Sequence, residues 1–147
     1  MAETVGSLVD KLTIVKLKQW HCDAVSKQES LALQESALVA ELDSLIGEAV
    51  SKSVHVNALK FSANKVYKKE GNSLRTFGGG FAASVSNLAK VNCELWHEQE
   101  KVYDFEAVPL AEKNLVVSNI ATLNLERNKL IEQIDDELIQ LLKESED

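Results

Sequence analysis

Glycine, proline and aromatic residues are scarce in this chain of 147 residues, which has one Pro, six Gly and 5% aromatic side chains. Because Gly and Pro are the residues that most often interrupt helices, their scarcity favours long helices. Runs that alternate apolar and polar residues, as exposed strands do, are also hard to find. The sequence therefore predicts an all-α fold.

The chain also lacks long apolar runs and an excess of basic residues. No apolar stretch approaches the ~18 residues of a membrane-spanning helix, and the N-terminal MAETVGSLVDKL has no basic segment followed by an apolar one. We therefore expect a cytoplasmic protein without a membrane partner. The net charge of -7 disfavours binding to nucleic acid, but it allows a small anionic ligand in one local basic pocket.

Cysteine is rare too, with only Cys22 and Cys93 in the chain. Each lies close to a Trp-His pair in the sequence, so the two can be neighbours in space and a disulfide is one alternative. In a reducing compartment two thiols usually stay free, which is the outcome we expect. Neither cysteine has the His and Asn context of a catalytic thiol, and no nucleophile elbow is present. We expect no cofactor.

Apolar residues at helical spacing predict four main helices. The first begins near Thr4 or Ser7, either of which can cap it with Asp10 as a capping-box acid, and ends at about residue 26. KQES links it to a second helix over residues 29–51, and a third covers residues 81 to 102 or 103. The last covers residues 109–143, with Pro109 in its first turn. We expect one domain over residues 1–147, an antiparallel bundle of four main helices plus a shorter segment.

Residues 54–80 fit the helical pattern least well. Leu59, Ala63 and Val66 have helical spacing, with Gly71 as a C-cap, but an irregular loop is the alternative. The three glycines of NSLRTFGGGF mark a clear break. This loop runs into the start of the third helix, where free N–H groups and Arg75 can hold an anion. A flexible connector is the interpretation that the composition favours.

The rare Trp and His residues fall into two matching segments. Trp20 and His21 in KQWH and Trp96 and His97 in ELWHEQE coincide when the chain is shifted by 76 residues. Two related helical hairpins are one interpretation, and coincidence of helical period is the other. We expect each Trp to pack at a helix crossing and each His to hydrogen-bond a neighbour. Glu94 and His97 have the spacing of a di-metal bundle, but Lys18 stands at the matching position, so we expect no metal site.

Several polar residues fall on predicted core-facing stripes. Arg127 lies between Leu123 and Leu130 on the last helix, and a buried charge must be paired or face a cavity. Other polar residues share the inner faces with it, namely Asp10, His21, Asn92, Asn124 and Asn128. Two interpretations stay open. One is a structural network that ties Arg127 to Asp10 or a glutamate, and the other is a polar cleft for a ligand.

The first functional hypothesis is a binding or accessory protein whose inter-helix cleft holds a small anionic ligand, such as a nucleotide-sugar or phosphate ester. Arg127 would anchor the anion, Asn92, Asn124 and Asn128 would orient it, and His97 would donate a hydrogen bond. Trp96, Asp10 and His21 complete the candidate site.

Two alternatives belong to other functional classes. One is a metal-dependent hydrolase of the all-α nucleotide pyrophosphatase type, using His97, Glu94, Glu98 or Glu132. Only half of the paired acidic motif is present, as Glu132 and Asp135. The other is a structural helical oligomer without a ligand, such as a homodimer through an exposed seam of the last helix.

NCELWHEQEK and TLNLERNKLIEQID, together with the N-terminal GSLVDKL, resemble an uncharacterised family of bacterial all-helical proteins known only as a domain of unknown function. The resemblance covers the first helix and the second half of the chain. It falls on Asp10, Lys11, His21, Asn92, Trp96, His97, Asn124, Arg127, Asn128, Glu132 and Asp135. Gln99 and Tyr103 replace an acid and an arginine of the family pattern, so a role that needs those side chains is lost or altered here. The resemblance implies an all-helical fold and gives no activity.

Overall fold

The computed structural model describes residues 3–60 and 74–145, and these form helices with no strand among them. The all-α prediction is therefore confirmed. The four long helices are α1 (Val5–His21), α2 (Val25–Val50), α3 (Phe81–Tyr103) and α4 (Leu110–Glu144). Two 3-10 turns, η1 (Val56–Ala58) and η2 (Phe105–Ala107), lie after α2 and α3. No helix among the described residues is long and apolar enough to cross a membrane.

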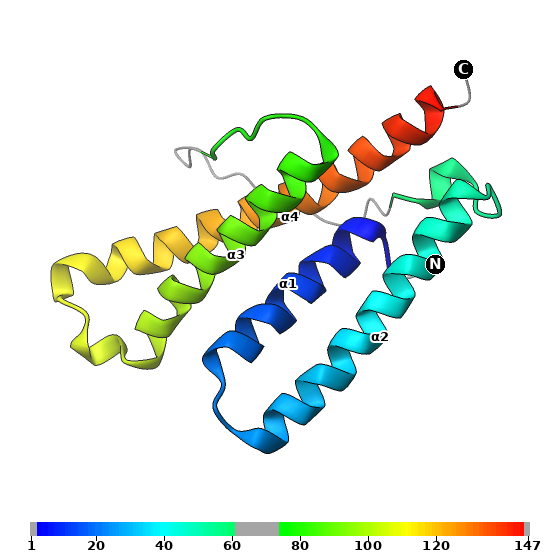
Figure 1. The fold of residues 1–147 in the computed structure, drawn as a ribbon. Helices are drawn as coiled ribbons and strands as arrows, with labels where there is room; N and C mark the ends of the chain where they lie inside the picture. The colour runs from blue at the N-terminus through cyan, green and yellow to red at the C-terminus, as the bar shows by residue number, and fades with distance from the viewer. Residues whose placement is uncertain (1–2, 61–73, 146–147) are drawn as a thin grey trace.

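The helices form two antiparallel hairpins, one made by α1 and α2 and the other by α3 and α4 (Figure 1). The hairpins are joined through α1, which packs against both α3 and α4. The core between them is apolar, and Leu8, Leu88, Leu130 and Ile134 are fully buried there. Burying each such side chain contributes roughly 1.5–3 kcal/mol.

The start of α1 is fixed by a reciprocal cap. Thr4 Oγ1 accepts a hydrogen bond from Ser7 N–H at 3.2 Å, and Ser7 Oγ accepts one from Thr4 N–H at 2.8 Å. Thr4 is thus the N-cap, one of the two residues predicted for this position. The prediction of Asp10 as the capping acid is wrong, because Ser7 fills that role and Asp10 is buried further along the helix.

The predicted link between the first two helices is also misplaced. α1 ends at His21 and α2 already begins at Val25, so KQES lies inside α2. KQES contains no Gly or Pro that would interrupt a helix. The Gln28 side chain donates instead to the carbonyls of Gln19, at 2.7 Å, and Cys22, and so satisfies the end of α1.

α1 crosses α4 very closely at Gly6. Its N–H donates to Asp135 Oδ1 at 2.8 Å. A Cβ atom at this position would lie 2.9 Å from that oxygen and closer still to the backbone oxygen of Ile131. The buried Asp135 carboxyl therefore receives an N–H from the first turn of α1, yet its burial raises its pKa to about 6.

The second hairpin follows the sequence prediction closely. α3 begins at Phe81 and ends at Tyr103, and Pro109 is the N-cap of α4. In the segment predicted least well, residues 74–80 are not helical, and Leu59 is buried next to η1. Ala63, Val66 and Gly71 lie outside the described residues.

The two Trp-His segments occupy different environments. The Trp20 side chain is 85% exposed, so the prediction that it packs at a helix crossing is wrong. Trp96 is half-buried and stacks on His21, with ring centroids 4.8 Å apart and an angle of 22° between the planes. One residue of each pair, His21 on α1 and Trp96 on α3, therefore contacts the other pair. The two Trp-His pairs do not have the same surroundings in the two hairpins.

Candidate functional site

A buried polar network connects α1, α3 and α4. Arg127 donates from Nε to Asp10 Oδ1 at 2.8 Å and from Nη2 to Asp10 Oδ2 at 2.6 Å. Asn92 Nδ2 donates to the same Oδ1 at 3.0 Å and to Thr13 Oγ1 at 2.8 Å. The hydrogen bonds to Asp10 raise the pKa of Arg127. This is the Asp10 to Arg127 network that the stripe positions predicted as one of two alternatives.

The other sequence-predicted residues are not all drawn into this network. Asn124 and Asn128 are half-buried, and their side chains make no hydrogen bond to another described residue. The His97 side chain is 69% exposed, and its Nδ1 lies 4.0 Å from Glu100. The structure therefore brings Asp10, Asn92 and Arg127 together and leaves His97 away from them.

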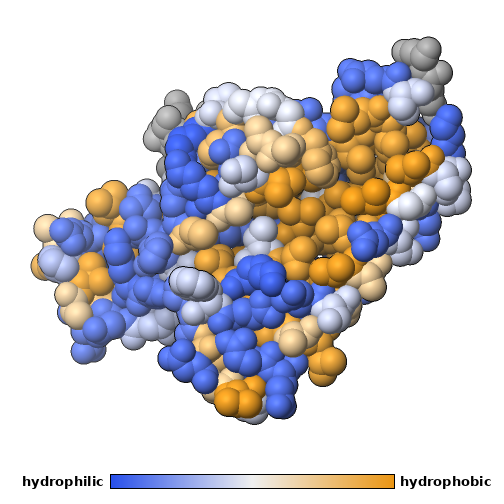
Figure 2. Space-filling view, viewed as in Figure 1, coloured by the Kyte–Doolittle hydropathy of each residue, from blue (hydrophilic) through white to orange (hydrophobic). Residues whose placement is uncertain are grey.

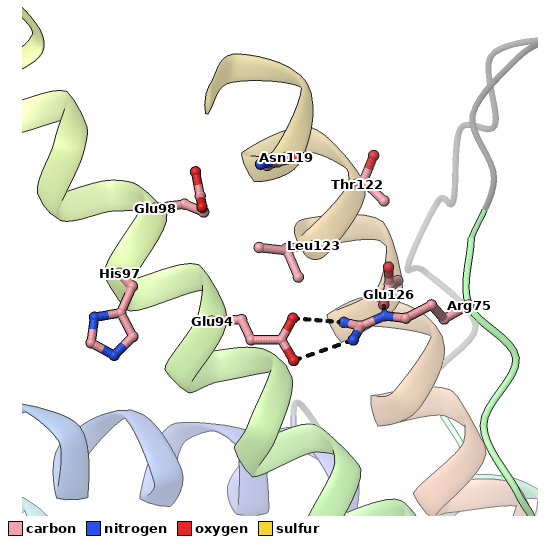
Figure 3. A pocket seen from close by; sticks show the side chains of 8 residues that line it. All are labelled: Arg75, Glu94, His97, Glu98, Asn119, Thr122, Leu123 and Glu126. Atoms are coloured by element: carbon pink, nitrogen blue, oxygen red, sulfur yellow. Dashed lines mark hydrogen bonds and ion pairs between the residues drawn. The ribbon is translucent and has the colours of Figure 1, made fainter. Parts of the chain in front are cut away.

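An acidic cleft of about 410 Å³ lies between α3, α4 and the segment before α3 (Figure 3). Arg75 donates from Nη1 and Nη2 to Glu94 at 3.2 and 3.0 Å, and from Nε to the buried Glu126 at 2.7 Å. Glu98 also lines the cleft, whereas the His97 ring points away from Arg75. The charge of Arg75 is therefore taken up by two carboxylates rather than offered to an anion.

Neither the acidic cleft nor the glycine loop has the features that the sequence hypotheses required. Within residues 3–60 and 74–145, no group of three or more His, Cys, Asp and Glu side chains is arranged to hold a metal ion. At the start of α3, Gly80 N–H donates to Glu137 Oε1 at 2.9 Å, so a carboxylate of α4 already occupies that helix end. The loop is docked on α4 by this contact.

A basic groove runs between α1 and α2. It consists of two adjoining depressions that share Lys18 and Gln34. The arginine depression, of about 340 Å³, is lined by Lys11, Ile14, Val15, Lys18, Gln34, Ala37, Leu38 and Arg127. The tryptophan depression, of about 320 Å³, is lined by Lys18, His21, Cys22, Lys27, Ser30, Leu31, Gln34 and Trp96. Each is of the size that small ligands occupy.

The lining of this groove differs in charge from the chain as a whole. It includes Lys11, Lys18, Lys27 and Arg127 and contains no carboxylate, although the net charge of the chain is -7. Lys11 is paired with Glu3, and Arg127 with Asp10. In the part of the chain that the structure describes, Lys18 and Lys27 have no ion-pair partner. The groove therefore carries two lysines that no described carboxylate pairs, on a chain whose net charge is negative.

The sequence placed Arg127, His21 and Trp96 in the candidate site but did not place Lys11, Lys18 or Lys27 there. A weak signal existed, because Lys11 and Lys18 are seven residues apart and so lie on one face of a helix. Nothing in the spacing showed that α2 would add Lys27 and Gln34 to the same groove. Comparison of the chain with protein-family models, with curated proteins and with solved structures found no match.

Proposed function

We propose that this protein binds a small anionic ligand, such as a phosphate ester, in the basic groove. The observation that carries the proposal is the distribution of charge. On a chain with a net charge of -7, two adjoining depressions are lined by four cationic side chains and by no carboxylate. Anions are held in proteins by convergent Lys and Arg side chains of this kind.

Arg127 is oriented for such a role by Asp10. The carboxylate engages Nε and Nη2 and so fixes the guanidinium plane, while Nη1 makes no hydrogen bond within the described residues. The side chain is 29% exposed and lines the arginine depression. A donor that is already held in place loses less conformational entropy when it binds a ligand.

Lys18 and Lys27 add charge that can be used without breaking an existing ion pair. Lys18 lines both depressions, and Lys27 lines the tryptophan depression. Gln34 and Ser30 supply neutral donors and acceptors beside them. The apolar walls, among them Val15 and Leu31, exclude water from one side and strengthen these interactions.

Of the two alternatives, the metal-dependent hydrolase gains no support from the acidic cleft, where Arg75 already bridges Glu94 and Glu126. A homodimer stays a prediction. Leu110 and Val117 are exposed and share one face of α4, which is compatible with a seam there.

The proposal is tested by calorimetric titration of the full chain with pyrophosphate and with ribose 5-phosphate, against uncharged ribose. The test variant is Lys18→Gln/Lys27→Gln, and the matched control is Lys90→Gln/Lys129→Gln, which removes the same charge from exposed positions outside the groove. We expect binding of both anions, at least tenfold weaker binding by the test variant, and less than about a twofold change in the control, because Lys90 and Lys129 line neither depression and exposed charges are screened at about 0.1 M salt.

Two outcomes contradict the proposal. If neither anion produces heat or raises the melting temperature, the groove is not an anion site. If both double variants weaken binding equally, the anion responds to overall charge and not to this groove.

A further inference from the structure

We infer that the ligand of the basic groove carries a flat aromatic or heteroaromatic ring beside its phosphate, as a nucleotide does, and that His21 and Trp96 receive this ring. The inference rests on the proposed function and deepens it. It is carried by the two aromatic rings of the tryptophan depression, because an anion would use Lys18 and Lys27 there and leave the rings of His21 and Trp96 without a partner in the ligand.

The His21–Trp96 stack forms one wall of this depression. The rings lie in the offset-stacked range, at 4.8 Å and 22°, and come from different hairpins. His21 is exposed and Trp96 is half-buried. Trp96 Nε1–H donates to Glu100 Oε1 at 2.7 Å, so its polar edge is already satisfied. The indole therefore offers the groove carbon surface, which suits a stacking partner rather than a phosphate.

His21 supplies a polar contact beside the stack. Its Nδ1 lies 2.8 Å from the Leu17 carbonyl oxygen, which can only accept, so Nδ1 carries the hydrogen. In the neutral ring Nε2 is then a hydrogen-bond acceptor. An amino or imino N–H at the edge of a heteroaromatic ring is the donor that this nitrogen would recognise.

The size of the groove fits one ligand that reaches both depressions. Lys11 and Lys18 are seven residues apart on α1, which is roughly 10 Å at the helical rise, and His21 lies about 5 Å further along. The two depressions adjoin at Lys18 and Gln34, which line both. A phosphate near Arg127 and a ring near Trp96 can therefore belong to one molecule.

The experiment uses the fluorescence of Trp96. The chain has two tryptophans, and Trp20 is 85% exposed, so Trp20→Phe leaves Trp96 as the only tryptophan with little expected effect on the fold. This background is titrated with adenosine 5′-diphosphate, pyrophosphate and adenosine. We expect the nucleotide to bind at least tenfold more tightly than pyrophosphate and to quench Trp96, because stacking on an aromatic side chain favours binding by about this factor.

Two further variants test whether the ring of the nucleotide stacks on Trp96. Trp96→Leu should raise the Kd of the nucleotide to that of pyrophosphate and leave the Kd of pyrophosphate unchanged. Trp96→Phe, which keeps an aromatic ring, should retain most of the preference. If Trp96→Leu does not fold, Trp96→Phe and the quenching in the Trp20→Phe background decide the question.

The outcomes separate this inference from the proposed function. If both ligands bind and the nucleotide binds no more tightly than pyrophosphate, the inference of a ring site is wrong and the proposed anion site is unaffected. Absence of binding by both overturns the proposed function and the inference with it. A nucleotide preference that leaves Trp96 unquenched, or that survives Trp96→Leu, shows that the ring lies elsewhere and also overturns the inference.

Discussion

Replacing Arg127 with Ala would leave the Asp10 carboxylate buried and without its ionic partner. Asp10 is 6% exposed, and Asn92 Nδ2 would be its remaining side-chain donor among the described residues. Removing one member of a buried ion pair costs about 3–5 kcal/mol, since the charge that remains has lost both its water and its partner. Arg127 is 29% exposed, so water can reach the vacated space, and we expect a value near 3 kcal/mol.

A double-mutant cycle isolates the pair from the other consequences of truncation. It comprises Arg127→Ala, Asp10→Asn and the double variant, each unfolded with urea and followed by the helical circular dichroism signal. We expect a coupling energy of about 2 kcal/mol or more, because residues in one hydrogen-bonded network are not additive. Lys129→Ala is the matched control on α4, and this exposed residue should change stability by less than about 0.5 kcal/mol.

An Arg127→Ala variant as stable as the original chain, or single effects that add without coupling, would contradict a stabilising role for this ion pair. In either case the bidentate geometry would not stabilise the fold.

Two further predictions concern the crossing of α1 with α4. Gly6→Ala should destabilise the fold by roughly 3 kcal/mol, since the added Cβ meets the backbone of Ile131. The control is Gly47→Ala on α2, where the added Cβ meets nothing within 4 Å and should stabilise the fold by about 0.5–1 kcal/mol. Equal effects of the two substitutions in urea unfolding would contradict the close approach of α1 to α4 at Gly6. Asp135 has a folded-state pKa raised to about 6 from 3.8, so its contribution to stability is present below pH 4 and is lost as the pH rises through 6. The free energy of unfolding should therefore fall by about 1 kcal/mol from pH 5 to pH 7. Asp135→Asn should make the free energy of unfolding depend less on pH in this range. An unchanged pH dependence in the variant would contradict the raised pKa of Asp135.

Local chemistry allowed much of the fold to be predicted from the sequence. Helical periodicity gave the four helices, and the Thr4 cap, Pro109 and the glycines before Phe81 placed three helix ends closely. The link after α1 was misplaced because it lacks the residues that normally mark a helix end. Its position depends on Gln28, whose side chain reaches back to the carbonyls at the end of α1.

The candidate site was harder to predict because it depends on which helices meet. Asp10 could be named in advance as one candidate partner of Arg127, beside a glutamate, since a buried charge needs a partner. The exposure of Trp20 could not be foreseen, because Trp20 and Trp96 have similar neighbours in the sequence and differ only in what packs against them. The basic groove is lined by residues from all four helices. The pattern of residues within one helix does not show which other helices pack against it.

The network and the groove place structural and binding roles on the same guanidinium. Asp10 on α1 holds two nitrogens of Arg127 on α4, and this contact helps to dock one hairpin on the other. The third nitrogen is left for the groove. An anion bound there would meet a side chain that is already positioned, and by mass action it would favour the docked arrangement. A structural network and a ligand site at Arg127 are therefore compatible, because the pair with Asp10 orients the group that would bind the ligand.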